Sequence, residues 1–318
     1  MADPFDKDAT AVYGAAEWLE PGIRRITCRN PSPMTFTGTQ TYLLGRGAVA
    51  LIDPGPDMED HRAAILAALE PGERIATILV THSHSDHSPG VAPLKAATGA
   101  EVLAFGPHGA GRSARMAALA ASGARFGGGE GADPSFAPDR LLADGEVAKG
   151  DGWAVRALHT PGHLSNHLAF AVEGLDGGAP GAVFSGDHVM AWATTMVSPP
   201  DGDMAAFMAS LRRMQGRWDR IYYPGHGAPV RDPEAMLAHQ IAHRAGREAQ
   251  ILSVLAEIGA ATPAQLTARI YADVDPALHP AAARNVLSHL IGMLEDGRAA
   301  VDGDLAPDAR FRARFRAE

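Results

Sequence analysis

The sequence contains a single cysteine and no apolar run long enough to cross a bilayer. Cys28 has no second cysteine in the chain with which to form a disulfide, which favours a reducing compartment. A membrane-spanning helix needs about 18 or more consecutive apolar residues, and no run in the sequence approaches that length. The first residues include aspartates and lack the apolar core of a signal peptide. We therefore expect a cytoplasmic protein that does not enter a membrane.

An excess of positive charge is also missing. The chain has 28 lysines and arginines against 37 aspartates and glutamates, and its net charge of −9 argues against a broad nucleic-acid-binding surface. The sequence contains no G-x-S-x-G elbow that would indicate a serine nucleophile. With 318 residues, 46% of them hydrophobic, the chain suits one large globular domain and a small one.

Short apolar segments bounded by glycine and proline predict strands in the first part of the chain. Helical spacing at 58–69 and 203–215 separates some of these segments. Two strand-rich halves predict an α/β fold in which two sheets form a sandwich with helices outside. The predicted strands are 23–29, 40–46, 48–52, 75–80, 101–105, 153–158, 168–172, 182–184 and 220–223.

The C-terminal part is mainly helical. One helix is predicted from Pro233 to Ile258, a second opens at Thr262-Pro263, and a third runs from Pro280 to about Asp296. A hairpin of 298–301 and 305–316 completes a winged-helix module. We expect a catalytic domain at 1–243 and this module at 244–318. The alternating arginines of 310–316 suit a phosphate-binding wing or, alternatively, a solvated edge strand.

Residues 106–137 form a long glycine-rich segment around a short alanine-rich helix. The segment includes Arg112, Arg115, Arg125 and three consecutive glycines at 127–129. A loop of this length in a compact domain is usually functional or disordered. We expect a mobile segment near the site, with an inert insertion as the alternative.

The stretch Thr81-His82-Ser83-His84-Ser85-Asp86-His87 follows the predicted strand 75–80. His82 and His84 are two positions apart, so an extended backbone points both imidazoles the same way. Asp86 and His87 follow where the chain turns. Imidazole and carboxylate are typical ligands of Zn²⁺. A histidine-rich surface loop is the alternative, but further candidates elsewhere favour a metal site.

Three more candidates, His163, Asp187 and His226, each follow a predicted strand in a tight turn. Taken singly, each is more often a turn residue than a ligand. Together with the first cluster they divide into two sets of three or four ligands, provided that one carboxylate bridges two metals. Asp187 is the natural bridge, because a carboxylate has two oxygens and an imidazole cannot share one nitrogen between metals.

This arrangement resembles the metallo-β-lactamase fold superfamily through THSHSDH, TPGH, SGD and PGHG, in that order along the chain. A closer resemblance is to the lactamase-β-2-like branch, which ends in a winged helix, through HTPGHLSNH, SGDHVM, YPGHGAPV and the HR-x₂-RE segment at 243–248. The resemblance implies a four-layer αββα sandwich. The insertion at 106–137 and His188, directly after Asp187, depart from the branch and leave the substrate open.

The resemblance also implies a role for each candidate residue. His82, His84 and His163 would hold one metal, Asp86, His87 and His226 would hold the other, and Asp187 would bridge them. Asp53 would orient a ligand histidine. We expect two Zn²⁺, with Mn²⁺ or Fe as alternatives, and a metal-bridging hydroxide as the nucleophile. Asp86 and Asp187 are the expected catalytic carboxylates. His167 and His188 could contact substrate or donate a proton, or else pack behind the site.

The first functional hypothesis is a hydrolase of small esters, thioesters or lactones. The alternatives are a metal-dependent endoribonuclease, a mononuclear iron persulfide dioxygenase, which uses fewer ligands, and a regulatory module in which the winged helix binds a partner. The expected partner is a small-molecule substrate, with single-stranded RNA and a second copy of the chain, in a homodimer, as alternatives.

Overall fold

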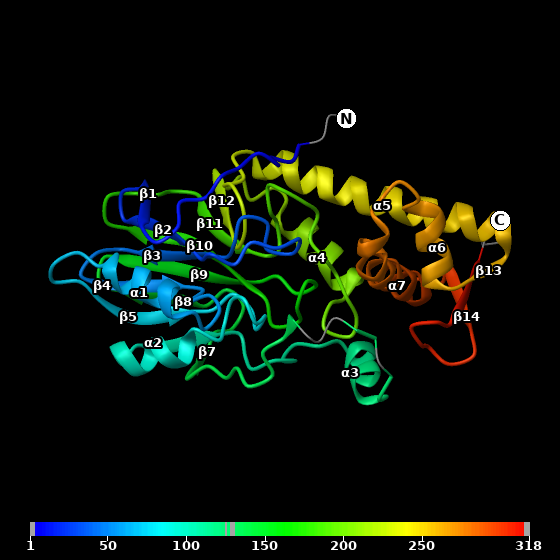
Figure 1. Ribbon diagram of the computed structural model, residues 1–318, viewed down its shortest axis with the longest axis horizontal. Helices are drawn as coiled ribbons and strands as arrows, with labels where there is room; N and C mark the ends of the chain where they lie inside the picture. The colour runs from blue at the N-terminus through cyan, green and yellow to red at the C-terminus, as the bar shows by residue number, and fades with distance from the viewer. Residues whose placement is uncertain (1–3, 125, 128–130, 315–318) are drawn as a thin grey trace.

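Two β-sheets stacked face to face form the larger part of the molecule, and helices with one small sheet form the rest (Figure 1). The computed structural model describes residues 4–124, 126–127 and 131–314. The larger sheet has seven strands in sequence order: β1 (Ala16–Glu20), β2 (Ile23–Thr27), β3 (Gln40–Leu44), β4 (Ala48–Ile52), β5 (Arg74–Leu79), β6 (Glu101–Ala104) and β7 (Arg140–Leu141).

The direction of the strands changes within this sheet. Strands β1 to β4 are antiparallel neighbours, whereas β4 to β7 run parallel. Parallel neighbours need a crossover connection, which is usually helical. Here α1 (Glu59–Ala67) joins β4 to β5 and α2 (Val91–Thr98) joins β5 to β6.

The second sheet has five strands in the order β12-β11-β10-β9-β8. Only the β11–β12 pair is parallel, and α4 (Met204–Met214) provides its crossover. Asp203 caps this helix by accepting hydrogen bonds from the backbone N–H groups of Ala205 and Ala206. The strands are β8 (Val147–Gly150), β9 (Trp153–His159), β10 (Leu168–Leu175), β11 (Ala182–Gly186) and β12 (Ile221–Pro224).

Three apolar cores separate four layers. Tyr42, Phe170 and Phe184 belong to the core between the two sheets. Helices α1 and α2 cover the outer face of the larger sheet, and α4 with α5 (Pro233–Ile258) covers the outer face of the smaller one. The order helix, sheet, sheet, helix confirms the predicted αββα sandwich. Strands β1, β7 and β8, which the sequence pattern did not reveal, are half-exposed or short elements whose pattern is weak.

The C-terminal part has the predicted winged-helix elements. Helix α5 runs without a break through the boundary expected between residues 243 and 244. It is followed by β13 (Ala260–Ala261), α6 (Pro263–Ile270), the 3-10 turn η2 (Pro276–Leu278), α7 (His279–Glu295), β14 (Ala299–Asp302) and β15 (Arg310–Ala313). The three strands form one small sheet in the order β13-β15-β14.

The arginines of the wing make contacts within the C-terminal part. Arg312 pairs with Asp302 across the β14–β15 hairpin, and Arg310 donates to the Ala260 carbonyl of the neighbouring strand. Phe315 and Arg316, which the predicted strand included, lie outside the described residues.

The segment 106–137 packs against the C-terminal part. Its helix α3 (Ala114–Ala121) lies beside the C-terminal helices and away from the sheets in Figure 1. Met116 and Leu119 share an apolar core with α5, α6 and α7, and Arg115 Nε lies 2.8 Å from Glu295 Oε1. Arg125 and residues 128–129 lie outside the described residues. Among the described helices, none is both long and apolar enough to span a membrane.

We expect Phe184→Ala to destabilise the protein by about 3–5 kcal/mol, because it leaves a cavity between the sheets. Phe184 is fully buried, and its ring centroid lies 5.0 Å from that of Tyr42 and 5.6 Å from that of Tyr223. Urea unfolding followed by circular dichroism measures the change. Leu141→Ala, at a position that is 60% exposed, is the control and should shift stability by no more than about 0.5 kcal/mol. Equal losses in the two variants would contradict the assignment of the core.

Candidate metal centre

The seven predicted ligands follow the ends of strands that belong to both sheets. Four come after β5, one after β9, one directly after β11 and one after β12. Because both sheets present these strand ends on the same side, the fold brings all seven side chains together. They form two groups, His82, His84, His163 and Asp187 in one and Asp86, His87 and His226 in the other, each with ligand atoms within 4.8 Å of one another.

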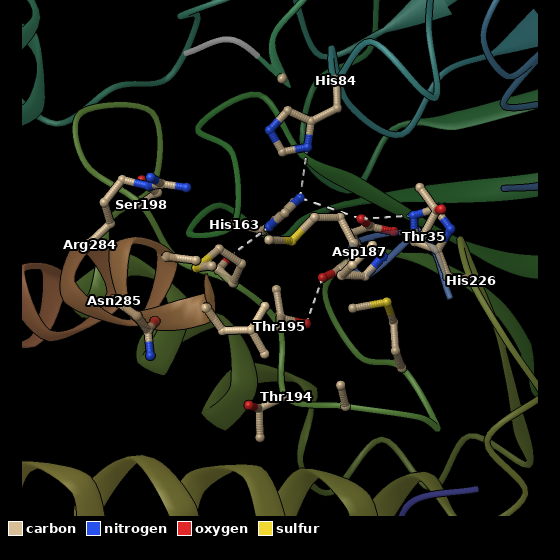
Figure 2. Close-up of a pocket in the computed structure, with 18 of the residues that line it drawn as sticks. Thr35, His84, His163, Asp187, Thr194, Thr195, Ser198, His226, Arg284 and Asn285 are labelled. Atoms are coloured by element: carbon tan, nitrogen blue, oxygen red, sulfur yellow. Dashed lines mark hydrogen bonds and ion pairs between the residues drawn. The ribbon is translucent and has the colours of Figure 1, made fainter. Parts of the chain in front are cut away.

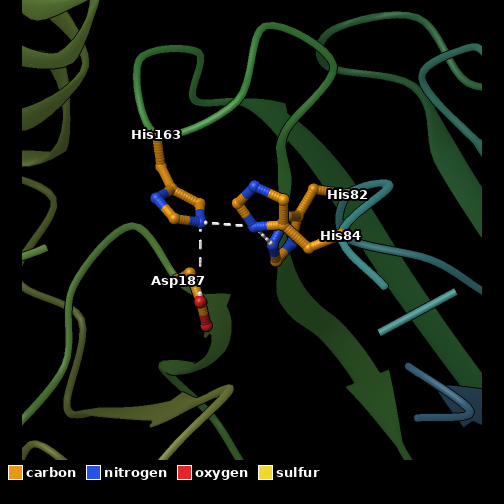
Figure 3. Close-up of side chains that lie close together, drawn as sticks. All are labelled: His82, His84, His163 and Asp187. Carbon is orange, nitrogen blue, oxygen red and sulfur yellow. Dashed lines mark hydrogen bonds and ion pairs between the residues drawn. The ribbon is translucent and has the colours of Figure 1, made fainter. Parts of the chain in front are cut away.

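In the first group the imidazoles of His82, His84 and His163 point toward one another (Figure 3). His84 Nδ1 lies 3.0 Å from His82 Nε2 and 2.9 Å from His163 Nε2. His163 Nε2 is also 3.5 Å from Asp187 Oδ2. His82 is fully buried, and its ring contacts those of His84 and His163 nearly edge-on.

The second group adjoins the first through Asp187. His87 Nε2 lies 3.3 Å from His226 Nε2, and Asp86 Oδ2 lies 3.4 Å and 3.2 Å from these two nitrogens. Asp187 contacts both groups, since its Oδ2 is 3.3 Å from His226 Nε2 and its Oδ1 is 3.5 Å from His87 Nε2. Its carboxylate therefore occupies the position from which one side chain can serve two cations.

The far nitrogen of four ligand histidines meets an oxygen. His163 Nδ1 lies 2.7 Å from the Met196 carbonyl, and His226 Nδ1 lies 3.2 Å from the Gly38 carbonyl. A carbonyl only accepts, so these Nδ1 atoms carry the proton and leave each Nε2 lone pair turned inward. His82 Nδ1 and His87 Nδ1 also carry the proton, because the Thr81 hydroxyl oxygen and the Asp53 carboxylate act as their acceptors.

Asp53 anchors both the strand end and a ligand. Its Oδ1 accepts from the Thr81 N–H and its Oδ2 from the Thr81 hydroxyl, each at 2.7 Å, while Oδ2 also lies 2.9 Å from His87 Nδ1. Because the Thr81 hydroxyl donates to Asp53, its oxygen is free to accept from His82 Nδ1 at 2.9 Å. One carboxylate thus orients two imidazoles.

In the absence of a metal ion, the pKa of His84 in the first group and that of His226 in the second are shifted in opposite directions. Burial lowers the pKa of His84 to about 3, and the neighbouring His163 acts in the same direction. Burial also tends to lower the pKa of His226, but the carboxylates of Asp187 and Asp86 outweigh it and raise that pKa to about 10. The first group therefore offers neutral imidazoles, and the second is a place where two carboxylates favour a positive charge.

This donor set fits divalent metal ions. Nitrogen lone pairs that face one another at about 3 Å repel unless a proton or a cation lies between them, and His84 Nδ1 faces two such nitrogens at once. Imidazole nitrogen with a few carboxylate oxygens suits Zn²⁺, Mn²⁺ and Fe. Among the described residues, Asp187 Oδ1 is buried and has no hydrogen-bond partner, as expected of an oxygen reserved for a metal.

The two remaining histidine candidates lie behind the centre. His167 Nε2 accepts a hydrogen bond from the Asp187 N–H at 3.1 Å, and its Nδ1 donates to Thr160 Oγ1 at 2.8 Å. It therefore positions the backbone of Asp187. His188 is fully buried, and its ring centroid lies 5.1 Å from that of Phe207 in an edge contact. Neither side chain lines the cavity onto which the candidate centre opens.

The candidate metal centre opens into a cavity of about 500 Å³. Figure 2 shows His84, His163, Asp187 and His226 on one side and Arg284 with Asn285 of α7 on another. Much of the lining is apolar and comes from both parts of the chain: Met34, Leu164, Met190, Trp192 and Met196 from the sandwich, and Val274, Leu278, Ala281 and Ala282 from the C-terminal part. No sequence pattern indicated that α7 reaches the site, because this placement depends on how two distant parts pack.

The segment 106–137 lies at the site, as expected, and both of its ends contact it. Ala132 forms a β-bridge with the candidate ligand His84, and the Asp133 N–H donates to the Ser83 carbonyl at 2.8 Å. At the other end Arg112 pairs with Asp201, which lines the cavity.

The comparisons with known proteins agree with this geometry. The family model of the metallo-beta-lactamase superfamily matches residues 34–226, and that of the beta-lactamase associated winged helix domain matches residues 262–309. An atrochrysone carboxyl ACP thioesterase of Aspergillus fumigatus is 34% identical over 80% of this chain and 74% of its own length. A beta-lactamase-like protein 2 homolog of Drosophila melanogaster is 31% identical over 92% of this chain and 94% of its own.

Two solved structures share the fold along nearly the whole chain. A metallo-beta-lactamase family protein of Thermus thermophilus has a TM-score of 0.73 and 25% identity over 93% of this chain and 100% of its own. A beta-lactamase domain protein of Burkholderia ambifaria has a TM-score of 0.77 and 21% identity over 96% of each chain. These matches confirm the predicted resemblance: the chain belongs to the metallo-beta-lactamase superfamily and carries the associated winged helix domain at residues 262–309.

Proposed function

We propose that this hydrolase of the metallo-beta-lactamase superfamily cleaves thioesters of acyl groups that are largely apolar. The observation that carries the proposal is that five of the seven proposed metal ligands, His84, Asp86, His163, Asp187 and His226, line a mostly apolar cavity of about 500 Å³. A cavity of that size and lining suits a small organic acyl group. Relatives named as atrochrysone carboxyl ACP thioesterases support thioester cleavage.

Two divalent cations, Zn²⁺ with Mn²⁺ or Fe as alternatives, are the proposed cofactors. We assign His82, His84 and His163 to one, Asp86, His87 and His226 to the other, and Asp187 to both. When bound, such cations supply Lewis-acid polarisation of the substrate carbonyl and a hydroxide nucleophile at neutral pH.

The protein's own groups hold the reacting atoms in place. Asp53 and Thr81 keep His87 and His82 turned inward, and His167 holds the backbone of Asp187. Asp86 lines the cavity and accepts a hydrogen bond from Thr39 Oγ1 at 3.1 Å, so its carboxylate is placed to orient an attacking water. The thiol that is released has a pKa of about 8.5, so it can depart as the thiolate without receiving a proton from a general acid. Neither His167 nor His188, which lie outside the cavity, is then needed as a proton donor.

Hydrolysis of a phosphodiester in RNA is less well supported. The cavity walls contributed by Met190, Trp192 and Leu278 do not suit a polyanion, and the net charge of −9 opposes binding of nucleic acid. The set of seven ligands also supports a binuclear centre over a mononuclear iron dioxygenase, which needs fewer ligands.

A substrate panel tests the proposed reaction. We expect the zinc-loaded protein to hydrolyse octanoyl-N-acetylcysteamine, with the released thiol measured by a thiol-reactive dye. The matched octanoyl oxygen ester and octanolactone should react at least about tenfold more slowly, because a thiolate is a weaker base and a better leaving group than an alkoxide. Single-stranded RNA should react at least about tenfold more slowly or not at all, because the apolar cavity does not suit it. Cleavage of the RNA with the thioester left intact would refute the proposal.

Removal of the metal tests the cofactor. We expect dialysis against a chelator to abolish thioester hydrolysis, because the nucleophile then has no source of activation, and refilling with Zn²⁺, Mn²⁺ or Fe²⁺ to restore it. Elemental analysis of the active protein should find about two metal ions per chain. One iron per chain with no zinc would contradict the binuclear assignment.

Asp53→Asn tests the positioning of the ligand histidines. The amide can no longer accept from both Thr81 and His87 as a carboxylate does, so we expect metal affinity or activity to fall by roughly 10–100-fold. Competition with a metal-binding dye measures the affinity. Asp57→Asn, at a side chain that is 59% exposed and pairs with Arg62, is the matched control and should leave both quantities unchanged. If the two variants behave alike, the role assigned to Asp53 is wrong.

A further inference from the structure

The wall of the cavity that faces the sandwich from the C-terminal part carries one cation among apolar side chains. Val274, Leu278, Ala281 and Ala282 line the cavity there, and so do Arg284 of α7 and Ser198 (Figure 2). The Arg284 side chain is half-buried, and its Nε is fully buried. A guanidinium in such surroundings is costly unless an anion or a hydrogen-bond acceptor pairs with it.

Arg284 has no such partner among the described residues. Its Nε is without a hydrogen bond, and the buried Ser198 Oγ, which also lines the cavity, is without one as well. The other arginines nearby are engaged: Arg112 with Asp201, and Arg244 with the Asn285 side chain and the Thr195 carbonyl. Asp201 lies within ion-pair distance of Arg112 and His108, and among the described residues it forms no ion pair with Arg284.

Gly127 lies close against the Arg284 side chain. A Cβ at Gly127 would lie 3.2 Å from Arg284 Cδ, which is closer than an ordinary contact. The remaining carboxylates that line the cavity, Asp86 and Asp187, belong to the metal centre. The cavity therefore has a cationic centre at one wall and an unpaired guanidinium with an unpaired hydroxyl at another.

We propose that Arg284, with Ser198, binds an anionic group of the substrate while the thioester carbonyl lies at the metal centre. The inference rests on the proposed thioesterase function and narrows its substrate to one that carries a second, negatively charged group. A carboxylate at the far end of the acyl group and a phosphate on the pantetheine arm of the thiol share the required chemistry. Both accept the charge-assisted hydrogen bonds that a guanidinium offers.

Paired substrates distinguish the two sources. The first arm compares glutaryl, suberyl and sebacyl thioesters of N-acetylcysteamine with the pentanoyl, octanoyl and decanoyl thioesters, which have the same lengths and no charge. The second arm compares octanoyl-4′-phosphopantetheine with octanoyl-pantetheine. We expect the wild-type protein to prefer the charged member of at least one pair in kcat/KM by about tenfold or more, the effect of one hydrogen bond to a charged group.

Arg284→Gln provides the decisive variant. The ratio of kcat/KM within the preferred pair should fall to about one, because glutamine keeps hydrogen-bonding capacity but loses the charge. Arg269→Gln, on α6 of the same domain at a side chain that is 50% exposed, should keep the wild-type ratio. Loss of preference in the first arm assigns a carboxylate, and loss in the second assigns a phosphate. Wild-type ratios that stay unchanged in Arg284→Gln in every pair would overturn the inference.

A binding measurement separates failure of this inference from failure of the proposed function. Glutarate and pentanoate share one carboxylate that can reach the metal centre, and only glutarate has a second. If the ligand is a carboxylate, calorimetry on the zinc-loaded protein should show tighter binding of at least one longer dicarboxylate than of its matched monocarboxylate. If the ligand is a phosphate, free 4′-phosphopantetheine should bind more tightly than pantetheine. Arg284→Gln should remove the difference. This readout holds even if no thioester is hydrolysed, an outcome that would refute the proposed reaction alone.

Discussion

The convergence of imidazole nitrogens around Asp187 is the constraint on which the rest of the site depends. Five histidines and two aspartates place their ligand atoms in two adjoining groups, in which His84 and Asp86 are half-buried and the other five side chains are buried. The outward nitrogens of four of these histidines are held by oxygens of Thr81, Asp53, Met196 and Gly38, which fixes the direction of their inward lone pairs. Nitrogen lone pairs this close together repel one another unless a positive charge lies between them.

The two sheets satisfy this constraint because both end at the same side. Tight turns after β9, β11 and β12 then bring the remaining ligands into contact with those after β5. Space is limiting at these turns: a Cβ at Gly225 would lie 2.3 Å from Asp187 Oδ1, and one at Gly162 would lie 2.3 Å from Phe207 Cα. The glycines of PGHG and TPGH are therefore required by close approach as well as by the turn.

The C-terminal part is coupled to the centre through buried polar contacts. Arg244, fully buried on α5, donates to the Thr195 carbonyl and to Asn285 Oδ1, and the Thr195 hydroxyl donates to the Asp187 carbonyl at 2.8 Å. In the same segment Glu248 lies 2.7 Å from Arg298 Nη1. The HR-x₂-RE segment thus joins α5 to the wing, to α7 and to the loop behind a ligand. The winged helix acts here as a wall of the cavity.

The sequence by itself predicted the order of the layers and the side chains that the fold gathers into the candidate metal centre. The ligand motifs are local, and each follows an apolar segment whose period reveals a strand, so Asp53, His82 and His226 could be placed at strand ends without coordinates. Only the tertiary structure decided what faces the centre. That His167 supports Asp187, that His188 packs on Phe207, and that Arg284 reaches the cavity all result from packing between segments far apart in the chain. Such contacts leave no periodic signal, because a helix that lines a cavity has the same apolar pattern as one that packs on a core.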